Sequence, residues 1–295
     1  MLTKAVPALG FPNASAHLQP LFDFARRRPL GAAAGVVVLL LGLAALLAEV
    51  IAPYNPFETS LLLMLRPPGL EHLLGTDPFG RDVLSRILYG SRTALLVGFS
   101  VALFGTVGGV VIGATSAYFG GKTDLLLQRT MDILLSFPLI ILAIAVVAIV
   151  GTGVGNVILA LAVPVVPRIA RVVRSSALAV RETAYVEAAR ALGASHGRII
   201  FTHMLPNLVA PILVMLTAYL GQAILLEASL SYLGLGVAEP TPAWGLMLRG
   251  AGMQFMERAP WLAVAPGVAI SLTVIAFSIL GDSLRDDFDP RLRMP

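Results

Sequence analysis

The chain has 295 residues, of which 57% are hydrophobic and only 13% charged, and its mean hydropathy is +0.85. Soluble globular domains carry roughly a quarter charged residues, so this composition indicates an integral membrane protein and excludes an ordinary soluble enzyme. The net charge of +4 comes from basic residues spread over several segments, which argues against a nucleic-acid partner.

The residue types that build covalent or metal sites are scarce. The sequence has no cysteine, which excludes disulfides and thiol chemistry. Its four histidines are scattered with no pair at ligand spacing, so we expect no metal centre.

Long uncharged runs predict membrane-spanning helices, because about 20 apolar residues are needed to cross a bilayer. They are 31–48, 93–119, 133–167, 208–226 and 259–281. The third run is too long for one helix, and the glycine-rich segment from Gly151 to Asn156 favours a turn within it. We therefore predict an all-α protein with six spans, two of them at 125–150 and 157–173; five spans is the alternative.

The basic residues predict the orientation. Arg26, Arg27 and Arg28 directly precede the first span, and most of the 21 lysines and arginines fall in segments on the same side, which indicates cytoplasmic termini. The first span is long and lacks a small-residue cleavage site, so it is expected to be an anchor and not a removable signal.

These predictions divide the chain into four parts. They are a cytoplasmic amino-terminal segment (1–30), the first span with an external loop (31–92), a core of five spans (93–281) and a cytoplasmic tail (282–295).

Two acidic residues lie at or near the outer ends of spans. Glu49 and Glu227 are candidates for a pathway or gating role, because acids within a membrane are commonly functional. The alternative is that both side chains simply reach the interface.

A stripe of small residues marks the second span. Gly105, Gly109 and Gly113 recur every fourth residue, which predicts a face where helices pack closely. A role in the translocation path is the alternative.

The segments 53–92 and 231–260 are expected to be external loops. Arg81 and Asp82, in the first of them, are candidates for pinning that loop onto the membrane domain.

The segment Gly120-Gly121-Lys122-Thr123 resembles a phosphate-binding loop only superficially. The first glycine of that motif is replaced by Ser116, and a membrane span stands where a strand is needed. We therefore expect no ATP hydrolysis by this chain.

A polar stretch at 168–206 lies between two apolar runs on the predicted cytoplasmic side. Residues 183–192 have high helix propensity, and Gly193 is the residue that best ends a helix. Ser195 is placed to cap a second short helix that runs through Phe201. The small Ala188 and Ala189 beside the charged Glu187 predict a docking surface for a soluble partner; an ordinary amphipathic connector is the alternative.

These residues match a family pattern. Glu187-Ala188-Ala189, Gly193 and Leu205-Pro206 resemble the "EAA loop" of the permease subunits of prokaryotic ABC importers. The similarity covers roughly residues 25–293 and is closest to the C-type permease of dipeptide and oligopeptide importers. The further motifs that carry it lie at 72–77, 80–86, 132–138, 203–207, 231–236 and 281–291.

The resemblance implies a permease in the prokaryotic cytoplasmic membrane that works only within a complex. A homologous B-type permease would complete the pathway, and a binding protein would deliver cargo from outside, with the external loops receiving it. Two ATPase subunits would bind ATP and magnesium, so no cofactor is expected in this chain. The contact with an ATPase would be made by Glu187, Ala188, Ala189, Gly193, Leu205 and Pro206.

Other functions remain as alternatives. The same family motifs occur in importers of nickel chelates and of glutathione, so short peptides are the family-level expectation for the cargo. A secondary transporter would need paired acids or broken helices near the middle of the bilayer. An intramembrane enzyme would need a catalytic residue set that this sequence lacks.

Overall fold

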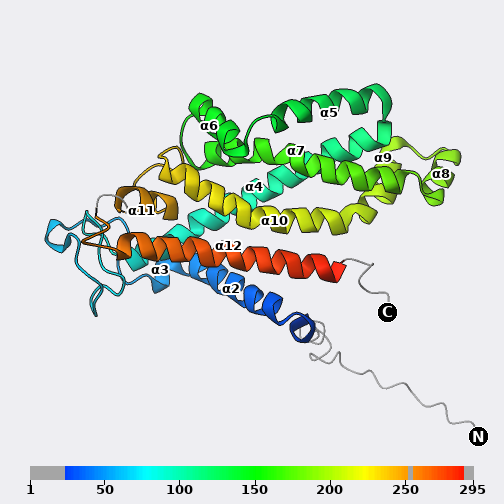
Figure 1. Cartoon of the computed structure of the whole chain (residues 1–295). Helices are drawn as coiled ribbons and strands as arrows, with labels where there is room; N and C mark the ends of the chain where they lie inside the picture. Colours follow the sequence, from blue (N-terminus) through cyan, green and yellow to red (C-terminus); the bar gives the residue numbers. More distant parts are fainter. Residues whose placement is uncertain (1–23, 252–254, 289–295) are drawn as a thin grey trace, which may run out of the picture.

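A computed structural model describes residues 24–251 and 255–288, and these form an elongated bundle of helices (Figure 1). The first part of the predicted segment 1–30 and the end of the predicted tail therefore lie outside the described residues. Within the described ranges the β structure amounts to one isolated bridge between Thr76 and Asp82. The helices are α2 (Pro29–Leu46), α3 (Ala48–Ile51), α4 (Val83–Phe119), α5 (Gly121–Leu135), α6 (Leu139–Val150), α7 (Val154–Arg181), α8 (Ala184–Ala191), α9 (His196–Arg198), α10 (Leu205–Tyr232), α11 (Trp244–Ala251) and α12 (Trp261–Phe288).

Five helices in the described ranges are long and apolar enough to cross a membrane: α2, α4, α7, α12 and the unbroken rod His196–Tyr232 that contains α9 and α10. The pair α5 and α6 makes a sixth candidate, although the two are bent by 92° relative to each other. The prediction of an all-α, multi-span protein is confirmed.

The prediction of one helix over 125–150 is wrong, because the chain breaks between α5 and α6. Pro138 lies at the break, and proline disfavours helical backbone in the residue before it, here Phe137. The turn predicted at the glycine-rich segment is confirmed: α6 ends at Val150, and Gly151 and Gly153 have φ of +87° and +124°.

The second span begins at Val83, well before the predicted position 93. Two arginines that resemble loop charges lie inside this helix and are satisfied there. Arg86 is only 2% exposed and donates to the Pro56 carbonyl at 3.1 Å. Arg92 donates to the Ala45 carbonyl at 2.5 Å, which ties α4 to α2.

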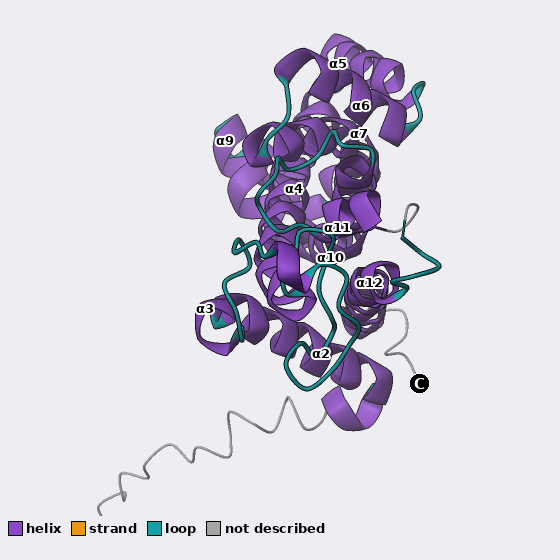
Figure 2. Ribbon diagram, turned by 90° about the vertical axis from the view of Figure 1, so that its left-hand side faces the viewer, coloured by secondary structure: helices purple, strands orange, loops and turns teal. Residues whose placement is uncertain are grey.

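Helix α4 occupies the middle of the bundle. Figure 2 looks along the bundle and shows α4 between the group α5, α6 and α7 and the group α10, α12 and α2. Its glycine stripe faces α7: a Cβ added at Gly109 would lie 2.6 Å from Ile169 Cβ, and one at Gly113 2.5 Å from the Ala170 carbonyl oxygen. The backbones of α4 and α7 are thus so close that no side chain fits between them at these positions.

Candidate functional site

The loop between α7 and α10 projects from one end of the bundle and carries the short helix α8 (Figure 1). Glu187 and Ala188 are exposed on α8, whereas Val186 is fully buried against the core and anchors the helix. Glu187 lies in the first turn and Arg190 in the last, which is the favourable order for a helix dipole.

The turn after α8 depends on one backbone conformation. Gly193 has φ of +80°, and its N–H donates to the Arg190 carbonyl at 3.0 Å. A Cβ at this position would meet nothing within 4 Å, so the requirement for glycine comes from the backbone angle and not from crowding. Ser195 then caps α9 as predicted, its Oγ accepting from the Arg198 N–H at 3.4 Å.

The predicted second short helix does not end at Phe201. The chain continues from α9 through a π-helical segment, Ile199–Met204, directly into α10. Pro206 explains the wider turn, because a proline has no N–H to donate and its ring clashes with the preceding helical turn. Leu205 and Pro206 therefore lie in the first turn of a long helix, with Leu205 partly buried and Pro206 exposed.

Large apolar side chains are exposed around this loop. Leu192 is 88% exposed, Phe201 71% and Tyr185 44%. They lie among Glu187 and Arg190, and such a mixture of apolar and charged groups at a protein end indicates a protein-binding surface.

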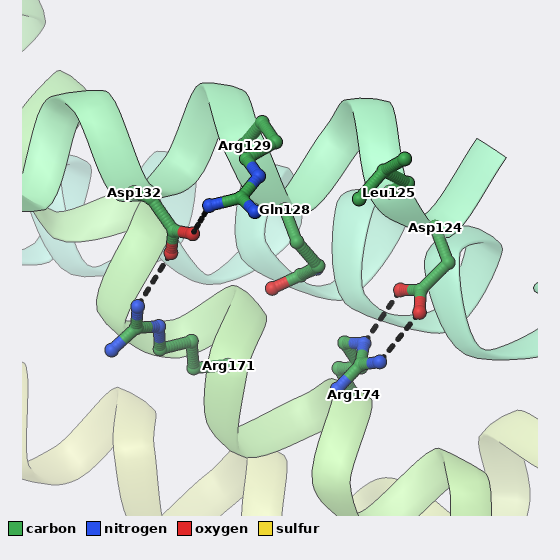
Figure 3. A pocket seen from close by; sticks show the side chains of 7 residues that line it. All are labelled: Asp124, Leu125, Gln128, Arg129, Asp132, Arg171 and Arg174. Carbon is green, nitrogen blue, oxygen red and sulfur yellow. Dashed lines mark hydrogen bonds and ion pairs between the residues drawn. The ribbon is translucent and has the colours of Figure 1, made fainter. Parts of the chain in front are cut away.

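A groove of about 490 Å³ lies between α5 and α7, and ion-paired side chains line it (Figure 3). Arg174 donates two hydrogen bonds to the Asp124 carboxylate, from Nε and from Nη2, and Arg171 Nη2 lies 2.5 Å from an Asp132 carboxylate oxygen. Arg129 lies 3.9 Å from the same Asp132 carboxylate. The charges compensate one another, so the groove joins α5 to α7.

Arg168, one turn earlier on α7, differs, because one of its guanidinium nitrogens has no partner among the described residues. Its Nη1 is buried and makes no hydrogen bond to any described residue. Arg168 is the first residue of the polar stretch predicted to be cytoplasmic, and nothing in its neighbourhood in the sequence indicates that its Nη1 lacks a partner.

The structure does not bring the two predicted acids together. Glu49 lies on α3, where its largely exposed carboxylate pairs with Arg92 at 2.7 Å. Glu227 lies on α10, is 1% exposed and accepts a hydrogen bond from the Ser231 hydroxyl at 2.6 Å. Glu227 is therefore buried among protein groups and does not reach the interface.

At the opposite end from α8, a buried polar cluster fixes the loop before α4. Asp82 caps α4 by accepting from the Ser85 N–H at 2.8 Å, and its other oxygen lies 2.9 Å from His72 Nδ1. Arg81 donates to Asp77 at 2.6 Å. Arg81 and Asp82 thus hold the loop onto the start of the helix. His72 and Asp77, the two ends of the motif 72–77, join them although no role of their own was evident from the sequence.

Comparisons with known proteins identify the family. Residues 109–294 match the family described as "binding-protein-dependent transport system inner membrane component". Residues 25–68 match the "N-terminal TM domain of oligopeptide transport permease C".

Similar proteins cover nearly the whole chain. A provisionally named peptide transport system permease protein of Brucella abortus is 46% identical over 88% of this chain and 87% of its own length. The dipeptide transport system permease protein DppC of Alkalihalophilus pseudofirmus is 42% identical over 88% of this chain and 84% of its own. The glutathione transport system permease protein GsiD of Pectobacterium atrosepticum is 43% identical, with shares of 90% and 89%.

A solved structure has the same fold. A chain of the MetNI methionine ABC transporter, described as inward facing, matches with a TM-score of 0.53 and 22% identity over 68% of this chain and 96% of that chain. The α7–α10 loop is therefore part of a chain that has the fold and the sequence of a transport subunit. The chain therefore belongs to the inner-membrane components of binding-protein-dependent transport systems, and it is a multi-span permease subunit of an ABC importer in the bacterial inner membrane.

Proposed function

We propose that this chain is the C-type permease of an importer of short peptides. A homologous B-type permease completes the pathway, two ATPase subunits bind ATP and magnesium, and a binding protein delivers the cargo. The match of residues 25–68 to the oligopeptide permease C domain and the names of the similar proteins support this proposal.

The observation that carries the proposal is the exposed helix α8 at one end of the bundle. Its charges keep it out of lipid, and its alanines allow another backbone to approach closely. We infer that Glu187, Ala188, Ala189 and Gly193 contact the ATPase, with Leu205 and Pro206 continuing the motion into α10.

The position of the chain ends supports the orientation. Figure 1 shows that the chain enters α2 and leaves α12 toward the end of the bundle where α8 lies. Arg26, Arg27 and Arg28 directly precede α2, and this concentration of positive charge supports assigning this end of the bundle to the cytoplasm.

Docking is tested by Glu187→Gln, with Asp282→Asn as a matched loss of one exposed acid elsewhere. In the complete complex in proteoliposomes, the first change should reduce ATP hydrolysis stimulated by the binding protein about tenfold, because a charged contact is lost. The control should leave hydrolysis unchanged. Equal hydrolysis by both variants would contradict the assignment of Glu187.

Cargo is tested on the cognate binding protein with a panel of dialanine, trialanine, tetraalanine, glutathione and a nickel–histidine chelate. Peptide import predicts tightest binding of one of the alanine peptides. Glutathione is the second candidate, because the GsiD relative is about as similar to this chain as DppC is. Retention of the nickel chelate alone would overturn the peptide proposal.

A further inference from the structure

Two residues that flank α8 in the sequence both contact the last turn of α4. Before α8, Arg181 Nη1 donates to the Ala117 carbonyl at 2.8 Å. After α8, His196 Nδ1 lies 2.7 Å from the Tyr118 hydroxyl, within hydrogen-bonding distance. The loop between α7 and α10, here called the docking loop, is therefore joined to α4 on both sides of α8.

Ring packing strengthens the second contact. The His196 ring lies 5.5 Å from the Tyr118 ring and 5.6 Å from that of Phe119. From α8 itself, the Arg190 guanidinium lies 5.9 Å from the centre of the Tyr118 ring. Tyr118 is only 7% exposed, whereas His196 and Arg190 are exposed, so these two residues cover a buried ring from the outside.

The first contact uses the chemistry of a helix end. The last carbonyls of a helix have no partner within the helix, and a cation is favourable there. Arg181 supplies such a cation to α4 from the end of α7. Holding the loop to α4 thus satisfies groups that α4 would otherwise leave to water.

At its other end, α4 holds the segments that lie outside the membrane. Trp244 Nε1 donates to the Ile87 carbonyl at 3.0 Å, and Thr93 Oγ1 donates to the Pro242 carbonyl at 2.9 Å. Asp82 fixes the preceding loop at the first turn. One helix that runs the length of the bundle therefore contacts both the docking loop and the external segments (Figure 1).

We propose that Tyr118 and His196 are positioning residues that make α4 move with α8 when the ATPase subunits close. This inference rests on the proposed function, because it requires an ATPase bound at α8. Tyr118 and His196 transmit the displacement, and Arg181 holds the other end of the loop to the same helix turn.

The test removes the hydrogen bond between Tyr118 and His196 while keeping an aromatic ring at each position. Tyr118→Phe and His196→Phe are each introduced into the complete complex, with Tyr89→Phe, at the far end of α4, as the matched control. The measurements are ATP hydrolysis and uptake of the panel peptide that binds tightest, both in proteoliposomes.

Tyr118→Phe and His196→Phe should each lower peptide uptake per ATP hydrolysed about fivefold, as expected for the loss of one hydrogen bond, while ATP hydrolysis continues. The double variant should be no worse than either single one, because both remove the same bond. Wild-type uptake per ATP in both single variants would overturn the inference.

Covalent rescue separates transmission from a merely structural role. The chain has no cysteine, so Tyr118→Cys with His196→Cys introduces its only two thiols. Bridging them with a short bis-methanethiosulfonate should restore uptake per ATP, and a reductant should abolish it again. The same uptake before and after bridging would contradict the proposal.

Failure of docking is recognised independently. Leu192→Cys places one highly exposed thiol at the end of α8 for coupling to the ATPase through a short maleimide–succinimide reagent. Coupling should occur equally in the presence and absence of Tyr118→Phe. Absence of coupling in both would overturn the proposed function itself, whereas coupling with unchanged uptake per ATP overturns only the role of Tyr118.

Discussion

Arg174 on α7 and Asp124 on α5 form a two-pronged ion pair, with Nε–Oδ1 and Nη2–Oδ2 distances of 2.6 and 2.5 Å. Both side chains are mostly shielded from solvent. Because α5 has only one buried residue of its own, Met131, this pair is a main attachment of α5 to the bundle.

Asp124→Asn should therefore lower the free energy of unfolding by about 1–2 kcal/mol, the range for a charged hydrogen bond in a partly exposed pair. The measurement is thermal unfolding of the detergent-solubilised chain. Glu71→Gln, which breaks the more exposed pair with Arg66, should cost less than about 0.5 kcal/mol. Equal losses in the two variants would show that the α5–α7 pair is not an attachment.

Gly113 should tolerate no side chain. Gly113→Ala places a Cβ 2.5 Å from the Ala170 carbonyl oxygen, so α4 and α7 must separate, at a cost of about 1–3 kcal/mol. Gly42→Ala on α2 is the control, because a Cβ there meets nothing within 4 Å. Thermal unfolding of both variants decides the matter, and equal stability would refute close packing of α4 on α7.

Gly193 should be sensitive for a different reason. Gly193→Ala forces an L side chain into a left-handed backbone, which costs about 1–2 kcal/mol, and Gly193→Asn should cost less. Gly197→Ala, nearby in α9 and equally open, should be neutral. Hydrogen exchange of α8 amides reports the effect: faster exchange is expected only in the Gly193 variants, with alanine above asparagine.

Arg168→Met should stabilise the isolated chain. An unpaired, partly buried cation costs free energy, so an apolar side chain of similar length should raise the melting temperature in detergent. Arg171→Met, which breaks the pair with Asp132, should lower it. A lower melting temperature for Arg168→Met would mean that the guanidinium has a stabilising partner within the chain.

Much of this architecture is local in the sequence and was therefore predictable. Apolar runs identify the spans, and Gly193 and Ser195 mark the turn after α8 because each acts on its own backbone. The start of α4 was missed because Arg86 and Arg92 resemble loop charges until their distant partners, Pro56 and Ala45, are known.

The contacts of the docking loop had no sequence signal. Tyr118 and His196 are 78 residues apart, and neither type at its position suggests the other. Likewise, Pro138 marks the break between α5 and α6, but neither it nor the hydropathy predicts the 92° angle between the two helices.

The bend between α5 and α6 also determines which flank of the subunit can border the bilayer. Helix α6 has 12 residues and is about 18 Å long, well short of the roughly 30 Å of hydrocarbon that a spanning helix crosses. Non-helical backbone at that depth is not tolerated against acyl chains, because its polar groups find no partners there. Residues 136–138 are exposed in the isolated subunit. Where α5 and α6 together cross the membrane, we therefore expect water or a neighbouring protein to shield this flank from the acyl chains.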